Sequence, residues 1–109
     1  MVKVEPRWID AYPVIAVEVQ LPKTTLLVLQ SNHGYIMCGA LDIQLLRDKL
    51  AHRGILAARA IGVRTLDELM DGTIESCTQA AESIGIVPGM PVQDAMLRII
   101  QQGNAAQSH

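Results

Sequence analysis

The sequence predicts an α+β domain: a two-layer sandwich in which a mixed, mostly antiparallel sheet carries helices on one face. Two observations predict this class. Residues in the first third of the chain alternate with the two-residue period of strands, and later residues repeat apolar side chains at helical spacing. Strands gathered early and helices gathered late are typical of such domains. We expect one domain over residues 1–103 and a flexible polar tail over 104–109.

The strand pattern is clearest in the first half of the chain. Ile15, Val17 and Val19 lie on one side of a predicted strand, and Pro22 begins a turn after it. Pro6 lacks a backbone donor, so the first strand is expected at the edge of an antiparallel meander. The predicted strands cover residues 2–9, 14–21, 26–29, 35–38 and 55–61.

The period changes to a helical one after Gly39. Ile43, Leu46 and Leu50 form an apolar stripe that ends at Gly54. Because a helix separates the strands at 35–38 and 55–61, these strands are expected to be parallel neighbours. Further helices are predicted from the Thr65-Leu66-Asp67-Glu68 capping box to Gly72, through Cys77, Ala80, Ala81 and Ile84 to Gly85, and from Pro91 to about Gly103.

Composition excludes several classes of function. Nine basic and eleven acidic residues give a net charge of −2 without a basic run, which argues against nucleic acid as a partner. No apolar segment approaches the ~20 residues that span a bilayer, so we expect a cytoplasmic protein that does not enter membranes. Cys38 and Cys77 are not spaced as metal ligands; free thiols, no metal site and no cofactor are expected.

The core is expected to be aliphatic, and part of the apolar surface to be covered by another copy of the chain. Half of the residues are hydrophobic, yet only Trp8, Tyr12 and Tyr35 are aromatic. This aliphatic content exceeds what one small two-layer core needs. We therefore predict a homo-oligomer.

Cys38 is the candidate catalytic residue. The sequence Cys38-Gly39 ends a predicted strand and leads into a helix, a setting that makes a thiol reactive. Cys38 could serve as a nucleophile, a persulfide carrier or a redox sensor, with His33 as its base. Alternatively, Cys38 is a small core residue and His33 a turn residue. A regular strand would also direct the two side chains to opposite faces.

A second candidate site is anion binding at the strand-to-helix turns. Arg59, Arg64 and Thr65 flank the turn after the strand at 55–61, and guanidinium and N–H groups hold phosphate or carboxylate. Parallel neighbouring strands would bring this turn beside Gly39 and Asp42 in one cleft. Alternatively, Thr65 and Asp42 only cap helices, and the arginines pair with surface carboxylates.

Several blocks of the sequence resemble a known family. They are Leu21-Pro22-Lys23-Thr24, the run His33-Gly34-Tyr35-Ile36-Met37-Cys38-Gly39-Ala40-Leu41-Asp42, the run Arg59-Ala60-Ile61-Gly62-Val63-Arg64-Thr65, and Gly89-Met90 through Ile100. In order and spacing these blocks resemble the YunC-like domains of unknown function of bacteria and archaea. The resemblance covers nearly the whole chain and implies a small two-layer α/β fold. It implies no established activity, substrate or catalytic residue.

Three functional hypotheses follow from the sequence. The leading one is a homo-oligomeric domain that binds a small anionic molecule around Cys38 and Arg64. The second is a thiol-dependent enzyme or sulfur carrier that uses Cys38. The third is a non-catalytic oligomeric interaction module.

Overall fold

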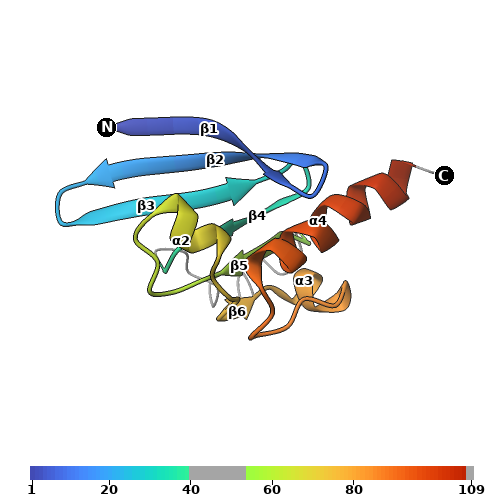
Figure 1. Ribbon diagram of the computed structural model, residues 1–109. Helices are drawn as coiled ribbons and strands as arrows, with labels where there is room; N and C mark the ends of the chain where they lie inside the picture. The colour runs from blue at the N-terminus through green and yellow to red at the C-terminus, as the bar shows by residue number, and fades with distance from the viewer. Residues whose placement is uncertain (40–53, 108–109) are drawn as a thin grey trace.

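The computed structural model describes residues 1–39 and 54–107, and in them six strands form one sheet (Figure 1). The strands follow one another across the sheet in chain order. Only β4 and β5 are parallel, as the intervening segment predicts, and all other neighbours are antiparallel. The strands are β1 (Val2–Ile9), β2 (Tyr12–Leu21), β3 (Thr24–Gln30), β4 (Gly34–Met37), β5 (Leu56–Arg59) and β6 (Ser76–Cys77).

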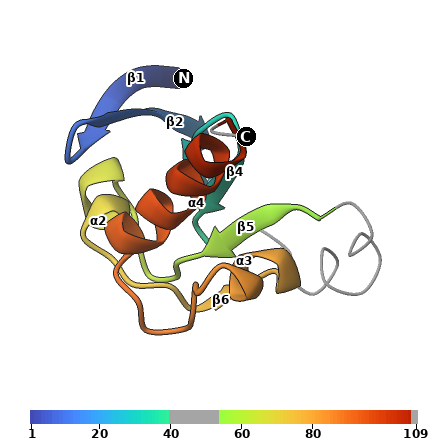
Figure 2. The ribbon, with the colours of Figure 1, turned by 90° about the vertical axis from the view of Figure 1, so that its right-hand side faces the viewer.

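Three helices follow β5 in the described part of the chain. They are α2 (Leu66–Met70), α3 (Gln79–Ser83) and α4 (Val92–Gln107). Figure 2 shows α4 lying in the concave side of the twisted sheet, with α2 beside it. The helix predicted before Gly54 falls outside the described residues. The α+β class and the mixed, mostly antiparallel sheet are confirmed.

The core lies between α2, α4 and one face of the sheet, which we call the inner face. Leu27 and Leu29 of β3 and Ile36 of β4 are fully buried there, as are Met96 and Ile99 of α4. No Phe and no Trp contributes to this core, as the composition predicts. The close packing of this core leaves no room for a side chain at Gly34, because a Cβ there would lie 2.9 Å from Ile99 Cγ2.

The opposite face of β1–β3, the outer face, is apolar, and its side chains are exposed or half-buried. The predicted alternation of β2 is correct, but only Val14 and Ala16 are buried, and Ile15 points outward with 40% of its surface exposed. Among the described residues no element covers this face. It comprises Val2, Val4 and Trp8 of β1, Ile15, Val17, Val19 and Leu21 of β2, and Leu26 and Val28 of β3. Val2, Val19 and Leu26 form one cross-strand row, and Val4, Val17 and Val28 form another.

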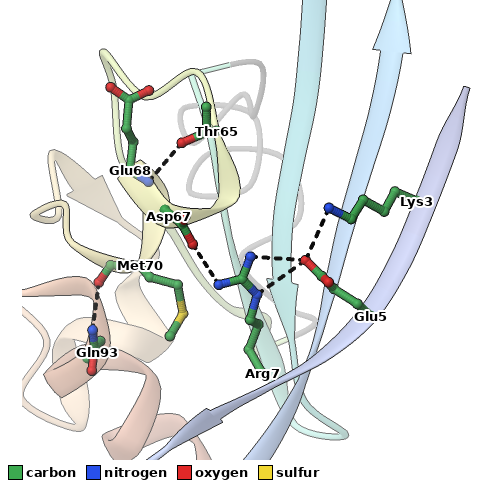
Figure 3. Close-up of polar contacts among 8 residues, drawn as sticks. All are labelled: Lys3, Glu5, Arg7, Thr65, Asp67, Glu68, Met70 and Gln93. Carbon is green, nitrogen blue, oxygen red and sulfur yellow. Dashed lines mark hydrogen bonds and ion pairs between the residues drawn. The ribbon is translucent and has the colours of Figure 1, made fainter.

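An ion pair joins β1 to α2. Arg7 Nη1 lies 2.7 Å from Asp67 Oδ1, and Arg7 Nη2 lies 3.0 Å from Glu5 Oε1 (Figure 3). The Asp67 and Glu5 carboxylates together raise the pKa of Arg7. Gln93 also donates to the carbonyl of Met70, at 3.1 Å. These contacts hold α2, and hence the loop before it, against the sheet.

Two predicted helix boundaries are wrong. Cys77 is not in a helix but at the end of β6, and α3 starts two residues later, because the Thr78 side chain accepts from Ala81 N and caps it. The last helix also passes through Gly103 and continues to Gln107. A single glycine costs a helix only about 1 kcal/mol, so it does not by itself end one.

Candidate functional site

The ends of β4 and β5 lie side by side, as the parallel pairing predicts. Ala60 N donates to Met37 O at 2.9 Å, which continues the pairing beyond both strands. At the next position a Cβ on Gly39 would lie 3.5 Å from Ile61 Cγ2. Gly39 is exposed, so this edge of the sheet is open to solvent. The candidate Asp42 lies outside the described residues.

Cys38 is buried just below this edge. Its side chain has 5% exposure and belongs to the core. Leu27 N donates to Sγ at 3.4 Å, and Sγ in turn donates to Thr25 O at 3.8 Å. The thiol therefore forms its hydrogen bonds with the backbone of β3. Because it is buried, Sγ is not accessible to a substrate. This arrangement matches the alternative interpretation, in which Cys38 is a core residue.

His33 lies in the turn between β3 and β4, at the opposite end of β4 from Cys38. The turn is closed by Ser31 N donating to Gly34 O at 2.9 Å, and the His33 side chain is exposed. Five residues of extended chain span about 16 Å, far beyond direct proton transfer. The structure does not bring His33 and Cys38 together.

Arg59 is held in an ion pair within the sheet. Its Nη2 lies 2.5 Å from Glu75 Oε1 and 2.9 Å from Oε2, and both side chains are about 28% exposed. The Arg59 hydrogen bond is the largest influence on Glu75 and holds the pKa of that carboxyl below its ordinary value. Arg59 thus serves the junction of β5 with β6, as the alternative interpretation expects of a paired arginine.

Thr65 is the N-cap of α2. Glu68 N donates to Thr65 Oγ1 at 3.1 Å, and Glu68 Oε1 accepts from Arg64 N at 2.9 Å (the Thr65 contact is drawn in Figure 3). The Thr65 half of the predicted capping box is present, whereas Glu68 accepts from the N–H of Arg64, one residue before the N-cap, and not from that of Thr65. The Thr65 hydroxyl is therefore engaged in the helix itself.

The Arg64 side chain lines a depression that sequence reasoning did not identify. The other lining residues are Lys23, Thr24 and Thr25 at the β2–β3 turn, and Val63 beside Arg64. The depression has a volume of about 460 Å³, and among the described residues that line it none carries a carboxylate. Among the described residues neither the Arg64 guanidinium nor the Lys23 ammonium has an ion-pair or hydrogen-bond partner. We call it the Lys23–Arg64 depression.

Lys23 occupies an unusual backbone conformation. Its φ of +67° lies in the left-handed region that glycine and asparagine favour. A positive φ directly after Pro22 is the pattern of a type II turn, which costs a non-glycine residue roughly 1–2 kcal/mol. The Leu21-Pro22-Lys23-Thr24 block carried this signal in the sequence, since a lysine stands where a glycine fits better.

The described residues offer neither a metal cluster nor a membrane span. No group of three His, Cys, Asp or Glu side chains in them could hold a metal ion. None of their helices is long and apolar enough to cross a bilayer.

Comparison with known proteins identifies the family. A model of a domain of unknown function, DUF1805, matches residues 37–99. The chain belongs to the DUF1805 family. It is 50% identical over 101 residues to the uncharacterised protein YunC of Bacillus subtilis. The aligned region covers 93% of this chain and all of YunC. The resemblance to YunC-like domains is therefore confirmed.

A solved structure shares the fold. The crystal structure of a protein of unknown function from Thermoplasma acidophilum matches with a TM-score of 0.81 and 25% identity. The match covers 91% of this chain and 93% of that one. In this DUF1805 chain Arg64 lies within the residues that the family model matches and Lys23 lies before them.

Proposed function

We propose that this domain binds a small anionic molecule in the Lys23–Arg64 depression. The observation that carries the proposal is a pair of cationic side chains, from two segments far apart in the sequence, that line one hollow whose described lining residues include no carboxylate. Of the residues predicted to bind an anion, this site includes only Arg64 among those that the structure describes. Its other polar residues come from the β2–β3 turn. Two unneutralised cations at one site cost electrostatic repulsion, which a bound anion relieves.

The conformation of Lys23 supports the same proposal. A residue in the left-handed region is strained unless it is glycine, and such strain is concentrated at functional sites. Lys23 and Thr24 also belong to the turn, whereas Arg64 belongs to the loop held by the α2 capping box. The backbone of both walls is therefore fixed before a ligand binds, which reduces the entropic cost of binding.

Thermal unfolding with a panel of small anions tests the proposal. Phosphate, nucleotides, sulfate and dicarboxylates are added at equal ionic strength, because screening by salt alone alters surface charge effects. At least one anion is expected to raise the melting temperature of the wild type, and the rise should be lost in Arg64→Gln. A panel without any specific rise, or a rise that Arg64→Gln leaves intact, would overturn the proposal.

The outer face supports a second candidate function, self-association. Five of the eight large apolar side chains that the described residues leave exposed lie on it: Val2, Val4, Trp8, Ile15 and Leu21. The uncovered end of the inner face instead carries Lys3, Glu18 and Gln20. The sheet thus presents apolar side chains to solvent on its outer face and charged side chains on the uncovered end of its inner face. Monomeric soluble proteins rarely expose a contiguous apolar patch of this kind.

We propose a second copy of the chain as the occupant of the outer face. Strands of eight residues at about 3.3 Å each, three abreast at about 4.8 Å, give a flat footprint of about 400 Å² before side-chain relief is added. This approaches the about 600 Å² per partner of small stable interfaces. The charge-free face fits a copy of itself across a two-fold axis. Light scattering checks this; a monomer at high concentration would contradict it.

A further inference from the structure

The Lys23–Arg64 depression has features that select among anions. The polar side chains that the described residues contribute to it are all able to donate: the guanidinium of Arg64, the ammonium of Lys23 and the hydroxyls of Thr24 and Thr25. Among the described residues none of these four side chains donates to another group. Arg64 alone satisfies the two oxygens of a carboxylate in its bidentate fork. A carboxylate oxygen can still accept a further hydrogen bond from Lys23 or a hydroxyl, but its single charge neutralises only one of the two cations.

A phosphate monoester matches this set of donors. It carries about −1.5 to −2 charges at pH 7 and presents three strongly accepting oxygens. Two cations balance that charge, and the guanidinium fork, the ammonium and a hydroxyl together supply enough donors for three oxygens. A carboxylate, with one charge and two oxygens, leaves one cation unneutralised.

The size of the depression indicates that the phosphate is attached to an organic group. About 460 Å³ lies within the range of small-molecule sites, about 300–1,000 Å³, and exceeds what a phosphate group alone fills. Val63 supplies one half-buried apolar wall beside the donors. We infer that the ligand of this site is a phosphorylated small molecule, a phosphate monoester with an organic substituent; this rests on the proposed function.

Three probes with one common organic group test the inference: phenyl phosphate, phenyl sulfate and benzoate, titrated by calorimetry. Phenyl sulfate is tetrahedral but carries a single charge, and benzoate offers a carboxylate. At pH 7.5 phenyl phosphate is expected to bind at least about tenfold more tightly than the other two. Lowering the pH to about 5, below the second phosphate pKa of about 6, should remove most of this advantage.

The charged groups at the depression make this pH test specific to the probe. They are Lys23, Arg64 and, among the described residues of α2, the Glu68 carboxylate that accepts from Arg64 N. Benzoate keeps its charge over this pH range, so any change in its binding reports a change in the protein and not in the probe.

Variants connect the binding to the site. Arg64→Gln and Lys23→Asn should each weaken phenyl phosphate binding by about tenfold or more, because each removes one charge-assisted contact. Asparagine tolerates the left-handed region, so Lys23→Asn should unfold at the same or a higher temperature. Arg98→Gln, which removes the same charge from α4, is the matched control and should leave binding unchanged.

Each outcome bears on one of the two proposals. Benzoate binding as tightly as phenyl phosphate would overturn the phosphate inference and leave anion binding intact. If no probe saturates, or if binding survives in both variants, the inference and the proposed function both fail. Loss of binding in the site variants alone, with the pH dependence of the phosphate, supports both.

Discussion

At the scale of single residues, the buried hydroxyl of Thr78 joins three backbone groups. It donates to Ile55 O at 2.6 Å and accepts from Ala57 N and Ala81 N, each at 3.3 Å. One side chain thus ties β5 to the start of α3. Thr78→Val keeps the shape but leaves these groups without their partner, and we expect a loss of about 1–3 kcal/mol in the free energy of unfolding.

Urea denaturation measures this loss. The exposed Thr73 provides the control, since Thr73→Val should change the stability by less than about 0.5 kcal/mol. Equal effects of the two substitutions would show that the hydrogen bonds of Thr78 contribute nothing beyond the general effect of removing a hydroxyl.

At the scale of elements, the junction of β5 with β6 depends on the Arg59–Glu75 ion pair and hence on pH. Arg59 lowers the pKa of Glu75 in the folded state below its ordinary value of 4.5. The pair therefore stabilises the fold fully above that ordinary value, and its contribution is lost as the pH falls through the folded-state pKa. Wild type should thus be more stable than Glu75→Gln at neutral pH, and the difference should vanish in acid.

Unfolding in urea at neutral pH and at about pH 3 measures the difference. Glu18→Gln is the control, because Glu18 forms no ion pair with any described residue, and its effect should be smaller at neutral pH. A stability difference between wild type and Glu75→Gln that is the same at both pH values would contradict the prediction.

The strands were predictable because their signals are periodic and local. Three signals predict the correct strand order: the alternation in β2, Pro6 in the edge strand, and the helical period of the sequence between β4 and β5. β6 was missed because two residues are too short for any period, and Ser76-Cys77 pairs with β5 only through tertiary contacts.

The site was only partly predictable for a related reason. Proximity of the two strand exits follows from parallel pairing, and Arg64 was proposed as a site residue on that ground. Lys23 precedes Arg64 by a long stretch of chain, and only the folded structure brings the β2–β3 turn next to the loop before α2. The burial of Cys38 likewise depends on its contacts with β3, so the residues adjacent to it in the sequence do not predict it.

At the scale of the whole molecule, the interface proposed for the outer face would couple folding to association. A copy that binds only the folded chain stabilises it by mass action, so the melting temperature should rise with protein concentration. Val4→Lys and Val17→Lys, which face each other across β1 and β2 on the outer face, should abolish this rise. Burying an unpaired ammonium costs several kcal/mol in such an interface.

Gln20→Lys is the matched control, since it adds the same charge to an exposed position on the inner face of β2. It should keep the concentration dependence of the wild type. The monomers of all four proteins should have similar melting temperatures when extrapolated to low concentration, because the outer face contributes little to the core. A melting temperature of the wild type that does not vary with concentration would mean that the apolar outer face stays exposed in solution or binds a different protein.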